Sequence, residues 1–143
     1  MEEQTIKLLD ECSKGCKMGT DSIEQVKDYV TDEDLWNVIE KYDGKYKELD
    51  DEIAGLLNEE GRPEQEPGKM ASVFSWITTE MKLMIKDDSQ QIAKLMMDGC
   101  NMGIQSISEA VNDNPEASRE SKAAAKRLVK ELENFMKDLK PFL

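Results

Sequence analysis

The chain has 143 residues and a net charge of −12 at pH 7; this length fits one domain, and the charge argues against nucleic acid and membrane surfaces as partners, since both attract clustered lysine and arginine. Histidine is absent, which excludes histidine-based catalysis and histidine-ligated metals. Three cysteines, an acidic start without a secretory signal and the lack of a long apolar stretch favour a cytoplasmic protein with free thiols and no membrane span.

Apolar residues in the first 60 positions follow the spacing of two packed helices. Steps of three and four residues define a first seam of Leu9, Cys12, Cys16, Gly19, Ile23, Val26 and Val30. A capping signal at residues 31–34 and a stop near Gly61 bound a second helix, with the seam Leu35, Ile39, Tyr42, Tyr46, Leu49, Ile53 and Leu56. The link between them is short, so we expect an antiparallel helical hairpin over residues 1–60.

Residues 61–87 are expected to form a long crossover. Residues 58–69 are polar and rich in proline and glycine, which predicts a loop, and the apolar residues 70–85 that follow predict a short helix near Trp76. A link of this length can travel the length of a long helix. We therefore expect the second and third long helices to run parallel.

Residues 88–143 predict a second helical hairpin. The third helix is expected to begin near Asp88 or Ser89, to end around Val111, and to turn inward Ile92, Met96, Cys100, Gly103 and Ile107. Asn114 and Pro115 are predicted to start the fourth helix, whose seam is Ala125, Leu128, Leu132, Phe135, Leu139 and Phe142. Residues 1–143 thus predict a single all-α domain without strands.

An internal repeat links the two hairpins. Residues 15–23 (GCKMGTDSI) recur as residues 99–107 (GCNMGIQSI), with identity at both glycines and at the Cys, Met, Ser and Ile. We infer a duplicated hairpin in which the first and third helices are equivalent. A helical glycine costs about 1 kcal/mol relative to alanine, so the glycines should allow a close helix crossing or clear space around the cysteines. We expect the first and third helices to cross most closely at Gly15, Gly19, Gly99 and Gly103. Cys16 and Cys100 are then expected to lie near a pseudo-two-fold axis between these helices.

With this repeat, the long crossover and residues 72–77 (SVFSWI) followed by Lys82, nearly the whole chain resembles a family of uncharacterised bacterial four-helix-bundle proteins of the ferritin-like superfamily. The resemblance implies a ferritin-like bundle. Metal-binding members of that superfamily carry inward-facing Glu and Glu-x-x-His motifs. Here no Glu-x-x-His is present, and Cys16 and Cys100 stand at central seam positions. A di-iron centre is therefore not expected.

The cysteines are the candidate metal-ligating residues. Cys12 and Cys16 share one helical face, and the repeat brings Cys100 near Cys16, with Met96 at the position equivalent to Cys12. Three thiols with an outside ligand suit Zn or Cu(I). The alternative is that these cysteines only pack as small buried hydrophobic residues. The methionines two positions further on are expected to point away from the cysteines: Met18 and Met102.

The remaining chemistry favours binding over catalysis. Tyr42 and Tyr46 lie on the second seam, so each hydroxyl needs a partner if it is buried. Trp76 is expected to cover the bundle. Because no acid–base or nucleophile pair is evident, no catalytic residue is assigned, and we expect a non-catalytic interaction or stress-associated module with a protein partner or a second copy of itself. The alternative function is a soft-metal-binding or thiol-redox protein that uses Cys12, Cys16 and Cys100.

Overall fold

The computed structural model describes residues 2–62, 76–86 and 88–143, and every regular element within these ranges is a helix. The long helices are α1 (Glu2–Val26), α2 (Glu33–Glu59), α5 (Ser89–Asp113) and α6 (Arg119–Leu139). The short elements are α4 (Thr79–Ile85) and two 3-10 turns, Lys27–Tyr29 and Lys140–Phe142. The all-helical prediction is confirmed for this part of the chain, and none of its helices has the length and apolar character needed to cross a membrane. Of the loop expected at residues 58–69 and the apolar segment expected at 70–85, residues 63–75 lie outside the described residues, and the short helix expected in this region is α4.

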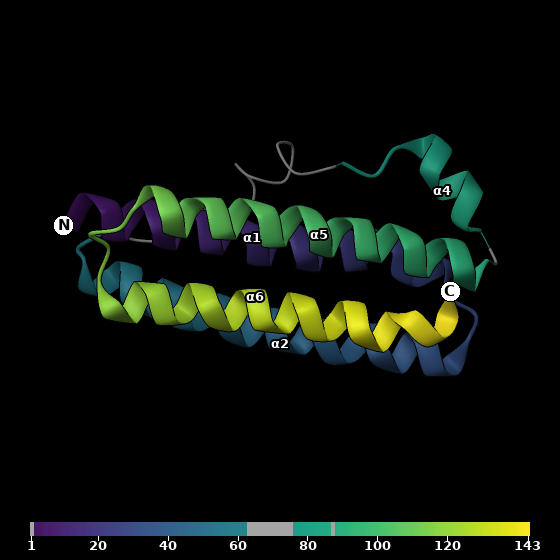
Figure 1. Cartoon of the computed structure of the whole chain (residues 1–143). Coiled ribbons are helices and arrows are strands. Elements are labelled where there is room, and N and C mark those ends of the chain that lie inside the picture. Colours follow the sequence, from purple (N-terminus) through teal and green to yellow (C-terminus); the bar gives the residue numbers. More distant parts are fainter. Residues whose placement is uncertain (1, 63–75, 87) are drawn as a thin grey trace.

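The long helices lie lengthwise against one another (Figure 1). α1 packs on α2 and α5, α6 packs on the same two helices, and α1 also contacts α6. α1 and α6 begin at the same end, where the Ser118 amide donates a hydrogen bond of 2.8 Å to the Thr5 hydroxyl. Tyr42, early in α2, reaches Asp138, late in α6, so these two helices run in opposite directions. α5 runs opposite to α1, and α2 and α5 therefore run parallel, as the long crossover predicted.

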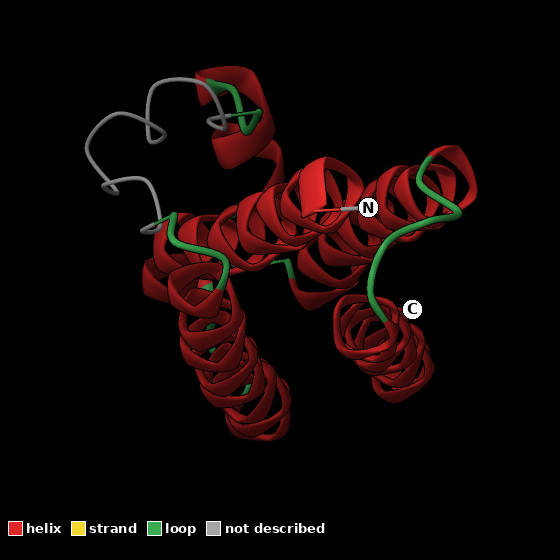
Figure 2. Ribbon diagram, turned by 90° about the vertical axis from the view of Figure 1, so that its left-hand side faces the viewer, coloured by secondary structure: helices red, strands yellow, loops and turns green. Residues whose placement is uncertain are grey.

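The short helix α4 stands outside the long helices and packs on α5. Figure 2 shows this short helix displaced from the four long helices. Its Ile85 is buried, while Leu83 and Met84 face outward. Trp76 and α4 thus lie on the outer side of α5, where Trp76 packs against Gly99.

Two helix boundaries follow the predicted capping signals. Asp32 precedes α2, and its carboxylate accepts a hydrogen bond of 2.9 Å from the Leu35 amide. Asp88 precedes α5 and accepts one of 3.1 Å from the Gln91 amide. Such caps satisfy an amide that the first helical turn leaves unpaired. After α2, Gly61 adopts a φ of 77°, a left-handed conformation that favours glycine and ends the helix.

The predicted start of the last helix was wrong. Asn114 caps the C-terminal end of α5, and its side-chain amide donates a hydrogen bond of 2.8 Å to the Ala110 carbonyl. α6 begins four residues beyond Pro115, after Ser118, whose hydroxyl accepts a hydrogen bond from the Ser121 amide. The Asn114 side chain is thus committed to the helix before it and cannot cap the one after it.

The predicted seams meet in a continuous core. The ring of Tyr42 stacks on Phe135 of α6 with centroids 4.6 Å apart, and the Tyr46 ring is tilted against the same phenylalanine at 6.2 Å. Seam residues with buried side chains include Leu9, Ile23, Leu35, Ile39, Ile53, Ile92, Ile107, Leu128 and Leu139. The two copies of the repeated sequence lie on the neighbouring helices α1 and α5.

Candidate functional site

Glycines of the repeat make room for aromatic rings from other elements. A Cβ atom added to Gly19 of α1 would stand 2.8 Å from Cδ2 of Tyr46, and one added to Gly99 of α5 would stand 3.0 Å from Cζ2 of Trp76. Both distances are shorter than ordinary van der Waals contact. Each ring therefore lies directly against helix backbone where any other residue type would have to displace it.

The other two repeat glycines receive aliphatic side chains. A Cβ atom on Gly103 would stand 3.1 Å from Cδ1 of Leu132. One on Gly15 would lie 3.4 Å from both Ile107 and Leu128, an ordinary contact. The packing benefit that offsets the low helix propensity of these glycines is therefore the admission of side chains from α2, α5, α6 and the crossover.

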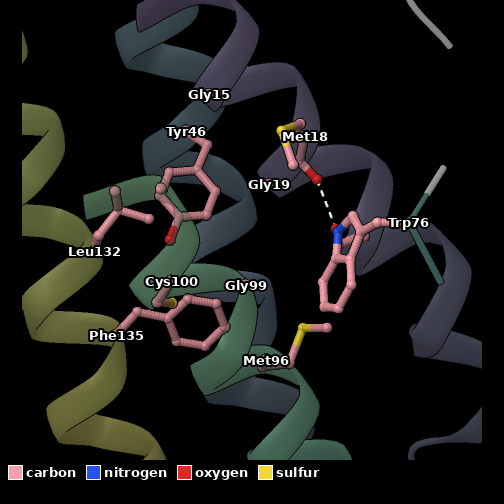
Figure 3. A pocket seen from close by; sticks show the side chains of 12 residues that line it. Gly15, Met18, Gly19, Tyr46, Trp76, Met96, Gly99, Cys100, Leu132 and Phe135 are labelled. Atoms are coloured by element: carbon pink, nitrogen blue, oxygen red, sulfur yellow. Dashed lines mark hydrogen bonds between the residues drawn. The ribbon is translucent and has the colours of Figure 1, made fainter. Parts of the chain in front are cut away.

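An apolar cavity lies where these side chains meet. The space open to the centres of water-sized spheres is about 40 Å³, enough for two or three waters at roughly 10–15 Å³ each. Met18 from α1 and Met96 and Cys100 from α5 line it, together with the four repeat glycines. Figure 3 shows Tyr46 and Trp76 on opposite sides of this cavity.

Tyr46 places a polar group in this apolar environment. The residue is 2% exposed, and apart from the neighbouring Cys100 thiol its hydroxyl has no hydrogen-bond partner among the described residues. It points toward the thiol of Cys100 (Figure 3), which is only a weak acceptor. Burial raises the pKa of Tyr46 well above its usual value, so the phenol stays protonated. By contrast, the Tyr42 hydroxyl donates a hydrogen bond of 2.6 Å to Asp138.

Trp76 is fixed by a hydrogen bond as well as by shape. Its indole Nε1–H donates to the Ser22 hydroxyl at 2.9 Å, and that hydroxyl donates at 2.7 Å to the Met18 carbonyl. The six-membered part of the indole lies against Gly99. As expected from the sequence, Trp76 covers the bundle, and it does so by bridging α1 and α5 over the cavity.

A wider groove adjoins the cavity on the outer face of α1 and α5. Its volume is about 300 Å³. It shares four lining residues with the cavity: Gly15, Met18, Trp76 and Gly103. Its other walls are Glu11 and Lys14 of α1 and Met102, Ser106 and Ile107 of α5. Cavity and groove together form a hollow between α1 and α5, which we call the crevice.

The expectation that Met18 points away from the cysteines holds only within its own helix. Met18 and Cys100 line the same cavity because they approach it from opposite helices. Residue spacing constrains direction along one helix and says nothing about a cysteine on its neighbour. Met102, its counterpart on α5, lines the groove and is 42% exposed.

The three cysteines are buried free thiols. Cys100 lines the cavity, whereas Cys12 and Cys16 lie deeper in the core. Burial raises the pKa of Cys12 and of Cys100 to about 12 and raises the pKa of Cys16 further. Without a metal ion these thiols stay protonated near neutral pH, and a metal bound to them would have to displace their protons. Across residues 2–62, 76–86 and 88–143, no three or more Cys, Asp or Glu side chains gather closely enough to hold a metal ion.

The core around Cys16 and Cys100 does not fit the oxygen-ligated di-iron centre of metal-binding ferritin-like proteins. Tyr46 lies close to both thiols, and burial beside them raises its pKa. Asp50, whose charge acts on Cys16, is paired with Lys17 at 3.0 Å. Thiols and a phenol are present where such a centre requires several carboxylates.

No protein-family model matches the chain, and neither a curated protein nor a solved structure does. The residues of the crevice therefore carry the functional argument. The sequence drew attention to its glycines, to Cys100 and to the seam position of Tyr46. It did not reveal the pairing of Trp76 with Ser22, although the repetition of this serine as Ser106 was an available signal.

Proposed function

We propose that this chain is a non-catalytic binding module whose ligand is a small, uncharged and largely apolar molecule held in the crevice between α1 and α5. The observation that carries the proposal is the buried hydroxyl of Tyr46, which lines an apolar cavity and, apart from the Cys100 thiol, lacks a hydrogen-bond partner among the described residues. An unsatisfied buried polar group costs about 1–3 kcal/mol. A ligand or water that accepts a hydrogen bond from this hydroxyl would recover that free energy.

The lining of the crevice favours an uncharged ligand. Methionine, leucine, aromatic and glycine residues surround the cavity. An unpaired charge transferred into such surroundings loses its hydration without compensation. Glu11 and Lys14 line only the groove, so any polar part of the ligand belongs at that outer end.

Binding without catalysis agrees with the chemistry of the site. The thiol of Cys100 and the phenol of Tyr46 are both protonated at neutral pH because burial raises the pKa of each. Neither has a base that would activate it as a nucleophile. The interaction or stress-associated role inferred from the sequence is proposed in this form, as ligand-dependent binding in the cytoplasm.

The proposed architecture is a ferritin-like four-helix bundle that arose by duplication of one helical hairpin. The parallel α2 and α5, the long link between them and the repeated segments on α1 and α5 support it. The alternative from the sequence, Zn or Cu bound through Cys12, Cys16 and Cys100, would require ionising buried thiols. Metal analysis of protein purified under reducing, chelator-free conditions, alongside the triple Cys→Ser variant, tests that alternative directly.

Methyl-labelled methionines provide the test of ligand binding. Xenon, which enters dry apolar cavities, probes the inner cavity, and benzene probes the whole crevice. We expect xenon to shift the Met96 methyl resonance and benzene to shift those of Met18 and Met102, each to saturation. Met136 of α6 lines neither hollow and serves as the internal control.

A matched variant strengthens the test. Cys100→Met adds heavy atoms at the cavity wall and should abolish the xenon response while leaving the protein folded. If neither probe gives a saturable shift in the wild-type protein, or if all labelled methyls shift equally, the crevice does not bind apolar molecules and the proposal is wrong.

A further inference from the structure

We propose that the groove is the second of two pseudo-equivalent seats for an indole-type ring. Trp76 of the chain itself occupies the first seat, and a small planar aromatic molecule with an N–H donor occupies the second. The inference rests on the proposed function and names its ligand class.

The first seat consists of a glycine, a serine and flanking methionines. The indole lies against Gly99, and its N–H donates to Ser22 at 2.9 Å. Met18 and Met96 line the same cavity as the ring, one above it and one below it in the view of Figure 3. The glycine allows the ring to approach the backbone, the hydroxyl satisfies the indole nitrogen, and the thioethers make favourable contacts with the aromatic surface.

The sequence repeat carries this set of contacts to the other helix. Positions 84 residues apart correspond in the two copies. If α1 and α5 are related by a two-fold axis, as the repeat implies for antiparallel neighbours, that axis exchanges equivalent positions and generates a second seat beside the first. The counterparts of Gly99, Ser22 and Met18 are Gly15, Ser106 and Met102, and all three line the groove.

The second seat offers an acceptor, the solvent-exposed hydroxyl of Ser106. Ser106 makes no hydrogen bond with the part of the chain that the structure describes, whereas its counterpart Ser22 accepts the Trp76 N–H. The second seat lacks a counterpart of Met96. The equivalent residue, Cys12, is buried in the core, and Glu11 and Lys14 line this part of the groove. Ile107 and Leu128 fill the space beside Gly15 that the indole fills beside Gly99, so a ring in the second seat rests on these aliphatic side chains and not on the backbone.

Trp76 itself supplies one wall of the second seat, since it lines both the cavity and the groove. A ring bound there lies beside the indole, and aromatic rings in offset or edge-to-face contact attract each other. The groove of about 300 Å³ has the size typical of small-molecule sites. The second seat therefore matches a ligand of about one or two fused rings.

A small molecule fits this surface better than a partner protein. Stable protein interfaces bury roughly 800 Å² on each partner. Among the described residues, the exposed large apolar side chains are Leu83, Met84, Met102 and Leu143, and of these only Met102 lines the groove. The groove thus lacks the surrounding apolar surface that a protein partner would cover.

The test compares indole with N-methylindole, which has the same ring system but no N–H donor. Calorimetric titration gives the affinities, and the Met102 methyl resonance reports the location. We expect indole to bind the wild-type protein about 3- to 10-fold more tightly, the usual contribution of one hydrogen bond. Ser106→Ala should erase this difference, and Ser108→Ala, two residues further along α5, should preserve it.

The outcomes separate this inference from the proposed function. Equal affinities in the wild-type protein, or a preference that survives Ser106→Ala, would overturn the second seat while benzene and xenon binding still supported the crevice as a site. Failure of every probe to bind would remove the proposed function as well. Tighter binding of N-acetyltryptophanamide than of indole would instead assign the seat to a tryptophan side chain of a partner protein.

Discussion

Replacing Gly19 by alanine should destabilise the protein even though alanine is the better helix former. The added Cβ would stand 2.8 Å from Cδ2 and 2.9 Å from Cε2 of Tyr46, a ring that is buried and packed against Phe135. Overpacking of this kind costs about 1–3 kcal/mol, and the gain in helix propensity returns about 1 kcal/mol. The expected net loss in the free energy of unfolding is roughly 0–2 kcal/mol.

Gly55→Ala is the matched control. This glycine also lies within a helix, α2, but a Cβ there meets no atom within 4 Å. The variant should gain about 1 kcal/mol of stability from propensity alone. Urea unfolding followed by circular dichroism at the helical band measures both variants, and their free energies of unfolding should differ by roughly 1–3 kcal/mol.

A double variant identifies the cause. In a Tyr46→Leu background the ring is gone, so Gly19→Ala should no longer cost stability, which is the signature of direct coupling. Equal stabilisation by Gly19→Ala and Gly55→Ala in the wild-type background would show that the ring does not press on this glycine. The explanation of the repeat glycines given above would then have to be withdrawn.

Further predictions concern titration and capping. The pKa values of Cys12 and Cys100, raised to about 12 by burial, predict slow reaction of the native protein with thiol reagents at pH 8 and fast reaction in urea. Because these pKa values exceed the unfolded value of about 8.5, the native state holds more protons at alkaline pH, so the urea midpoint should fall as pH rises above that value; a constant midpoint would contradict the reasoning. The Tyr42 hydroxyl lowers the pKa of Asp138, so this carboxylate stabilises the fold above its unfolded pKa of about 3.9 and the effect is lost as pH falls further. In Tyr42→Phe the free energy of unfolding should therefore fall less between pH 4 and pH 2 than in the wild-type protein. An equal fall in both proteins would contradict the proposed effect of Tyr42 on Asp138. Asp32→Ala should cost about 1 kcal/mol in thermal unfolding by removing the cap of α2, and no change in melting temperature would refute that role.

The helices were predictable because their signals are local. The apolar spacing of the seams and the acidic caps at Asp32 and Asp88 depend on residues within one or two helical turns. The start of α6 was missed because Asn114 can serve either the helix before it or the helix after it. Only the distance to the Ala110 carbonyl decides between them.

The candidate site was less predictable because it is tertiary in origin. Glycine spacing indicated close packing, but nothing local states that Tyr46 and Trp76 would be the rings admitted. The sequence suggested that the three cysteines form one metal site, whereas the structure places Cys100 in a cavity with methionines of α1 and α5. A hydroxyl becomes unsatisfied only after all its neighbours have been placed, and a sequence pattern does not contain that information.

The contact between α1 and α6 has a consequence for how the chain reaches its native state. The hydrogen bond from the Ser118 amide to Thr5 joins residues 113 positions apart. During synthesis the α1–α2 hairpin leaves the ribosome long before α6 exists. The apolar face that α5 and α6 later cover therefore remains exposed to solvent. Long-range closure of this kind slows folding relative to helical proteins built from local contacts. The nascent hairpin therefore spends that interval with apolar surface exposed, a state in which chaperone binding competes with aggregation.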